Sequence, residues 1–154
     1  MRKLGLSTLL IIALLAISGA AFTANADDGG RKFTTTLLGA NERPGPGDPD
    51  GTGVASLRLN PGAGQVCYTI TYINVNGVTA GHIHRAPADS PGPVVVGLYP
   101  IAPDTGPDTD GTIKGCVSAD RSLILGIIQN PEDYYVNLHN DEYRAGSIRG
   151  QLAK

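Results

Sequence analysis

Residues 65–85, Gln-Val-Cys-Tyr-Thr-Ile-Thr-Tyr-Ile-Asn-Val-Asn-Gly-Val-Thr-Ala-Gly-His-Ile-His-Arg, carry the pattern that decides the fold. Apolar and polar side chains alternate from Gln65 to Ile73, which is typical of a strand with one buried face. Asn76-Gly77 is a strong turn signal, and Ile83 beyond it again alternates with its neighbours. The stretch therefore predicts two antiparallel strands joined as a hairpin.

The same alternation recurs along the chain between loops rich in proline and glycine. It predicts further strands at Phe33–Leu38, Val54–Leu59, Thr112–Ser118, Tyr134–His139 and Ser147–Leu152, and the apolar run Val94–Tyr99 predicts another. Ser122–Ile128 is better interpreted as a short helix, with Asp120 as its N-cap and Pro131 after its end. A buried strand is the alternative there, because Gly126 and two isoleucines lower helix propensity. The pattern predicts an all-β domain, an immunoglobulin-like or Greek-key β-sandwich or barrel with one short helix.

The first 26 residues have the three regions of a secretory signal peptide. Arg2 and Lys3 precede an apolar run over 9–17, and Ala24-Asn25-Ala26 provides a small-residue cleavage site. A retained membrane anchor is the alternative, but the run is shorter than the roughly 20 residues that span a bilayer. We expect cleavage after Ala26, which leaves residues 27–154 as one β domain without a membrane span.

The charge of the mature domain argues against a nucleic-acid partner. Loss of Arg2 and Lys3 leaves ten of the 12 basic residues against 14 acidic ones, a net charge near −4. The basic residues are scattered and form no run. We therefore expect a secreted or periplasmic protein whose partner is a protein or a surface component.

Cys67 and Cys116 are the two cysteines of the chain. Each lies on the polar phase of its predicted strand, and a signal peptide leads to a compartment where disulfides persist. We therefore predict a cross-strand disulfide on the outer face of the sheet. A metal thiolate site and two free thiols are the alternatives.

The three histidines of the chain are His82, His84 and His139. Alternation places each imidazole on the side of its strand opposite Ile83, Val136 and Leu138, which belong in the core. If the two strands are neighbours, the rings can hold one Cu or Zn ion. Water would take the remaining position, or a carboxylate such as Asp89, Asp141 or Glu142. The alternative is structural: the rings bond loop carbonyls and pack against Tyr135 or Tyr143.

Other chemistry has little support in the sequence. A nucleophile elbow, a phosphate loop and a dinucleotide fingerprint are all missing, so we assign no catalytic residue. Arg149 lies in phase with Gln151 and could orient a carboxylate. A structural salt bridge or a solvated side chain is the simpler interpretation of this arginine.

Several segments resemble the chordin-type (CHRD) domain family. They are Leu38–Pro44, Val66-Cys67-Tyr68, His82-Ile83-His84, Gly92–Val96, Gly115-Cys116-Val117, Asn130–His139 and Ala145–Leu152. Asp141–Arg144 departs from the family, where a shorter, less charged turn is more common. The resemblance implies an extracellular all-β domain acting as a non-enzymatic binding or structural module. The alternative is a small copper or zinc metalloenzyme, or a metal carrier, built on the three histidines.

Overall fold

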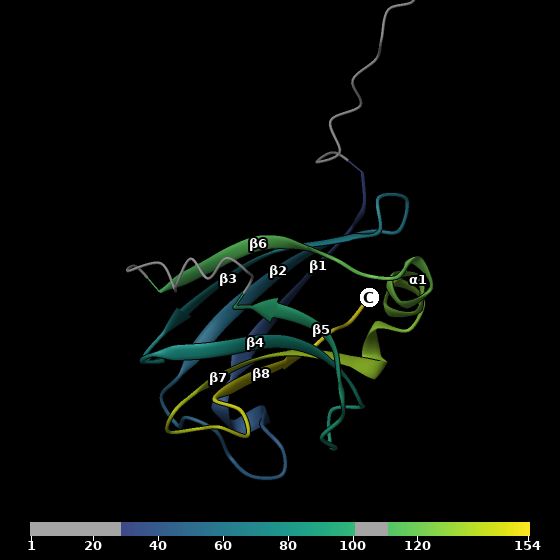
Figure 1. Cartoon of the computed structure of the whole chain (residues 1–154). Helices are drawn as coiled ribbons and strands as arrows, with labels where there is room; N and C mark the ends of the chain where they lie inside the picture. The colour runs from purple at the N-terminus through teal and green to yellow at the C-terminus, as the bar shows by residue number, and fades with distance from the viewer. Residues whose placement is uncertain (1–28, 101–110) are drawn as a thin grey trace, which may run out of the picture.

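The computed structural model describes residues 29–100 and 111–154, which form eight strands and one α-helix (Figure 1). The strands are β1 (Arg31–Leu38), β2 (Thr52–Asn60), β3 (Gln65–Ile73), β4 (Val78–Arg85), β5 (Val94–Tyr99), β6 (Thr112–Ser118), β7 (Tyr134–Asn140) and β8 (Ile148–Gln151); the helix is α1 (Arg121–Gln129). Short 3-10 turns span Gly39–Asn41 and Pro131–Asp133. The predicted all-β fold with one short helix is confirmed. The predicted signal peptide lies outside the described residues.

The eight described strands form one antiparallel sheet. Their order is β5-β4-β7-β8-β1-β2-β3-β6. The two outermost strands, β5 and β6, contact each other, so the sheet curves round a common interior into a nearly closed barrel (Figure 1). The barrel alternative therefore describes the architecture better than a sandwich of two separate sheets.

The hairpin predicted for residues 65–85 is wrong in its pairing, although both of its strands exist. β3 pairs with β2 and β6, whereas β4 pairs with β5 and β7. The connecting segment contains Val75, which is buried in the hydrophobic core, and Gly77, whose φ is +62°. Burial of Val75 in the core favours this connection between non-neighbouring strands over one that folds β4 back along β3.

The core fills the inside of the barrel and explains the helix. Leu57, Ile70 and Ile83 face inward from three strands and are buried. Ile124 and Ile127 of α1, three residues apart on one side of the helix, join the same core. The helix interpretation is confirmed and the buried-strand alternative is wrong. No helix within residues 29–100 and 111–154 is both long and apolar enough to cross a membrane.

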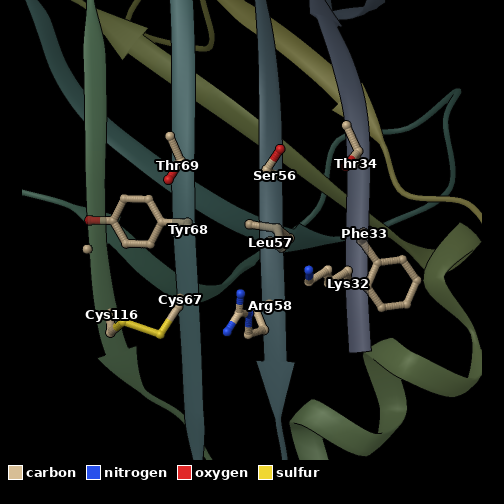
Figure 2. A pocket seen from close by; sticks show the side chains of 11 residues that line it. Lys32, Phe33, Thr34, Ser56, Leu57, Arg58, Cys67, Tyr68, Thr69 and Cys116 are labelled. Atoms are coloured by element: carbon tan, nitrogen blue, oxygen red, sulfur yellow. A yellow bond between two sulfur atoms is a disulfide. The ribbon is translucent and has the colours of Figure 1, made fainter. Parts of the chain in front are cut away.

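Cys67 and Cys116 lie directly opposite each other on β3 and β6. Their sulfur atoms are 2.09 Å apart, the separation of a disulfide, and Figure 2 shows the link between the two strands. It borders an open depression of about 530 Å³ whose lining includes Lys32, Arg58 and Thr69. This depression is formed by β1, β2, β3 and β6, so the histidine-bearing strands do not line it.

Candidate metal centre

Two neighbouring strands hold the three histidines. His82 and His84 belong to β4, and His139 belongs to β7. In the β4–β7 register His139 lies opposite Ala80, two residues from His82. Ile83 and Leu138 point into the barrel core, so the alternation of each strand turns the imidazoles to the outer side.

The three rings lie against one another. Their centroids are 5.0 Å apart for His82 and His139, 5.4 Å for His82 and His84, and 6.1 Å for His84 and His139. One ring nitrogen of each residue lies within 4.8 Å of the corresponding nitrogens of the other two. The structure thus brings together the three residues that the alternation places on one face. No carboxylate within the described part of the chain joins this group, so Asp89, Asp141 and Glu142 do not complete it.

A loop covers His84 from outside the barrel. The side chain is 8% exposed, and its Nδ1 donates to the carbonyl of Gly92 at 2.8 Å. The ring stacks on Tyr135 with centroids 4.8 Å apart and planes 7° from parallel. The Gly92 N–H in turn donates to the Tyr135 hydroxyl at 3.3 Å. The loop between β4 and β5 therefore fixes both the orientation and the tautomer of His84.

His139 is held in the same way by a different loop. Its Nδ1 donates to the carbonyl of Arg144 at 3.0 Å, in the turn between β7 and β8. Metal-binding histidines usually donate their other ring N–H to a carbonyl or carboxylate, which fixes the tautomer and leaves the second nitrogen for the metal. The contacts expected of structural histidines are thus present, and they are also the contacts expected around a metal.

Two ring nitrogens of the cluster are buried and find no hydrogen-bond partner among the described residues: Nδ1 of His82 and Nε2 of His84. Buried polar atoms are nearly always paired, so two unpaired atoms in one cluster require an explanation. A bound cation would satisfy both. The hydrogen bonds that the described residues supply leave both nitrogens without a partner.

Burial keeps these imidazoles neutral. Burial, together with charge repulsion from the neighbouring His139 and His84, lowers the pKa of His82 to about 4. Burial likewise lowers the pKa of His84 and that of His139. The neutral ring is the form that binds a metal ion, so the site is in its binding form at neutral pH.

Arg149 lies beside the cluster, and the interpretation of it as a solvated side chain is wrong. It is 1% exposed, and its guanidinium carbon lies 3.4 Å from the centre of the Tyr135 ring. Its terminal nitrogens donate to the carbonyls of Pro87 and Ser90 at 2.8 and 2.9 Å. Arg149 therefore binds the covering loop to β8 through hydrogen bonds to backbone oxygens.

A comparison with known protein families matches residues 33–152 to the CHRD domain. The chain belongs to the CHRD domain family. Comparisons with curated proteins and with solved structures gave no match. The match covers all eight strands of this CHRD domain except the first two residues of β1, so the histidine cluster lies within the family's own fold.

Two further polar residues of this CHRD domain adjoin the histidines. Asn137 lies two residues before His139 on β7, so alternation places both side chains on the same face of the strand. This shared face is the sequence signal that could have identified Asn137 as a neighbour of the histidines. Glu42 follows β1 in a loop whose sequence gives no sign of burial, yet it is 3% exposed, and Asn137 lies close enough to lower its pKa. Gly146 packs against it: its φ is +150°, and a Cβ there would lie 2.3 Å from the Glu42 carboxyl group. Burial raises the pKa of Glu42 to about 7.

Proposed function

We propose that this CHRD domain is an exported, non-enzymatic module that binds one Cu or Zn ion through His82, His84 and His139. One observation carries the proposal. Nδ1 of His82 and Nε2 of His84 are buried without a partner in the described structure, inside a cluster whose ring nitrogens lie within 4.8 Å of one another. Modest ring rotations would bring such nitrogens to the distance of about 2.0–2.1 Å that imidazole ligands keep from zinc.

The ligand chemistry supports a transition metal over a harder cation. Imidazole nitrogen suits copper and zinc, whereas Ca²⁺ and Mg²⁺ select oxygen ligands. No carboxylate joins the cluster within the described residues. The carbonyls of Gly92 and Arg144 already hold His84 and His139 in the tautomer that leaves Nε2 available.

Export is part of the same proposal. The first 26 residues have the pattern of a signal peptide, and the two cysteines lie at disulfide distance, as suits an oxidising compartment. We therefore place the mature domain outside the cytoplasm, either secreted or periplasmic. In that location it would encounter copper or zinc without competition from a reducing thiol pool.

The test is metal analysis of the exported protein, purified without a histidine tag. Calorimetric titration of the metal-free protein with Cu(II) and with Zn(II) should give about one equivalent per chain for at least one of them. His84→Ala should abolish uptake, and His82→Ala, at a half-buried position, is a milder second variant. Asp89→Asn is the matched control, because it lies in the covering loop but outside the cluster. Unchanged affinity in both histidine variants, with unfolding curves like the parent's, would overturn the proposal.

A further inference from the structure

Asn137 occupies the middle of the histidine cluster. It lies directly opposite His82 in the β4–β7 register and precedes His139 by two residues on the same face of β7. Its side chain is 1% exposed. Besides its contact with His139, the amide lies close enough to His84 to affect that ring's pKa. The position of this amide among the three imidazoles makes its oxygen and nitrogen candidates for contact with whatever the histidines bind.

The contact between Asn137 and His139 joins two acceptors. Because the Arg144 carbonyl can only accept, Nδ1 of His139 carries the ring hydrogen, and Nε2 of the neutral ring presents a lone pair. That Nε2 lies 3.1 Å from Oδ1 of Asn137, which also presents lone pairs. Two facing lone pairs repel each other unless a cation lies between them.

The orientation of the amide follows from its other neighbour. Glu42 lies on the other side of the amide, and Asn137 lowers the pKa of this carboxyl group, the effect expected where the amide NH₂ group faces it. Oδ1 is consequently directed at the histidines. Rotating the amide by 180° would remove the repulsion at His139 but would turn the NH₂ group away from Glu42.

We infer, on the basis of the proposed function, that Oδ1 of Asn137 is the fourth ligand of the bound metal ion. Two ligands that each lie about 2.0–2.1 Å from one ion are separated by about 2.8–3.4 Å at angles from about 90° to tetrahedral. The 3.1 Å between Oδ1 and Nε2 of His139 falls in this range. The ligand set becomes three nitrogens and one amide oxygen, all from β4 and β7.

A fourth protein ligand changes what the metal can do. Catalytic zinc sites keep one position for water or substrate, whereas structural sites are filled by protein. With Asn137 bound, the ion has no solvent position in a tetrahedral arrangement. The inference therefore assigns the site to stable metal holding, which agrees with a non-enzymatic module.

The experiment loads untagged protein with Cu(II) and with Co(II) and compares three variants. Asn137→Ala removes the oxygen ligand and opens a position for water. Asn137→Asp replaces the amide oxygen with a carboxylate oxygen. Asn140→Asp is the matched control, because it makes the same change at a buried asparagine on the opposite face of β7.

Water-proton relaxation by Cu(II) should be low in the parent and should rise several-fold in Asn137→Ala, with Cu(II) affinity falling at least about tenfold. The visible bands of Co(II) should shift in Asn137→Asp and stay unchanged in Asn140→Asp. If Asn137→Ala binds Cu(II) with parental affinity and relaxation, or if Asn137→Asp leaves the Co(II) bands unmoved, Asn137 is not a ligand and the three-histidine site stands alone. If the parent takes up neither Cu(II) nor Zn(II), the proposed function fails as well.

Discussion

Glu42→Gln should make the metal-free domain more stable at pH 8 but not at pH 4.5. Glu42 is 3% exposed, and burial raises its pKa from 4.5 to about 7, against the smaller opposing effects of Arg149, Asn137 and Arg43. The folded state therefore holds this proton more tightly than the unfolded chain does. Its contribution to stability is fully present below pH 4.5 and is lost as the pH rises through about 7.

The size of the effect follows from the same pKa values. A rise from 4.5 to about 7, at about 1.4 kcal/mol per pH unit, corresponds to about 3 kcal/mol. Glutamine stays neutral, so the free energies of unfolding of the two proteins should diverge by about this amount between pH 4.5 and pH 8, in favour of Glu42→Gln. The histidines titrate in both proteins, and their contributions cancel in the difference.

Urea unfolding followed by circular dichroism at four pH values, with a chelator present, measures this difference. Glu132→Gln, at an exposed glutamate, is the control and should show no comparable divergence. A Glu42→Gln difference that stays constant from pH 4.5 to pH 8 would refute the reasoning, because it would mean that the buried carboxyl group does not change its protonation with folding.

Three other predictions concern the rest of the chain. Replacing Cys67 and Cys116 with serine should lower the free energy of unfolding by about 4 kcal/mol, because the pair closes a loop of 49 residues; unfolding of oxidised parent and variant measures it, and equal midpoints would contradict it. Arg149→Lys should cost about 2–3 kcal/mol and speed proteolysis within residues 86–93, because lysine lacks the planar fork that bonds the Pro87 and Ser90 carbonyls; parental cleavage rates would count against this role. Mass spectrometry of the exported protein should give a chain beginning at Asp27, and a mass that includes residues 4–17 would disprove cleavage.

The strands could be predicted from the sequence because the barrel has one inner and one outer face. The ranges expected for β3, β5 and β6 match the observed bounds. β3 and β6 alternate between core and exterior, whereas β5 is an apolar run whose last two residues, Leu98 and Tyr99, are both buried. The helix was predictable for a related reason. Ile124 and Ile127 recur at helical spacing, between a suitable N-cap position and a proline.

The pairing of the strands could not be predicted in the same way. Alternation identifies a strand and its inner face, but it does not identify the neighbouring strand. Asn76-Gly77 favours a hairpin locally, yet both edges of β3 are occupied by β2 and β6. The proximity of His139 to His82 was therefore a conditional prediction, and the β4–β7 pairing satisfies the condition.

The environment of the histidines was hidden from the sequence for a different physical reason. A residue on the outer phase of a strand is expected to face water, but here two loops lie over the outer side of β4, β7 and β8. They present backbone carbonyls to it, from Gly92 to His84, from Arg144 to His139, and from Pro87 and Ser90 to Arg149. Carbonyl groups belong to every residue type, so no side-chain pattern reveals them. Because the loops present backbone acceptors, the side chains beneath them are ones that can donate hydrogen bonds. Nδ1 of His82 and Nε2 of His84 have no hydrogen-bond partner among the described residues, and a cation would bind at these two atoms.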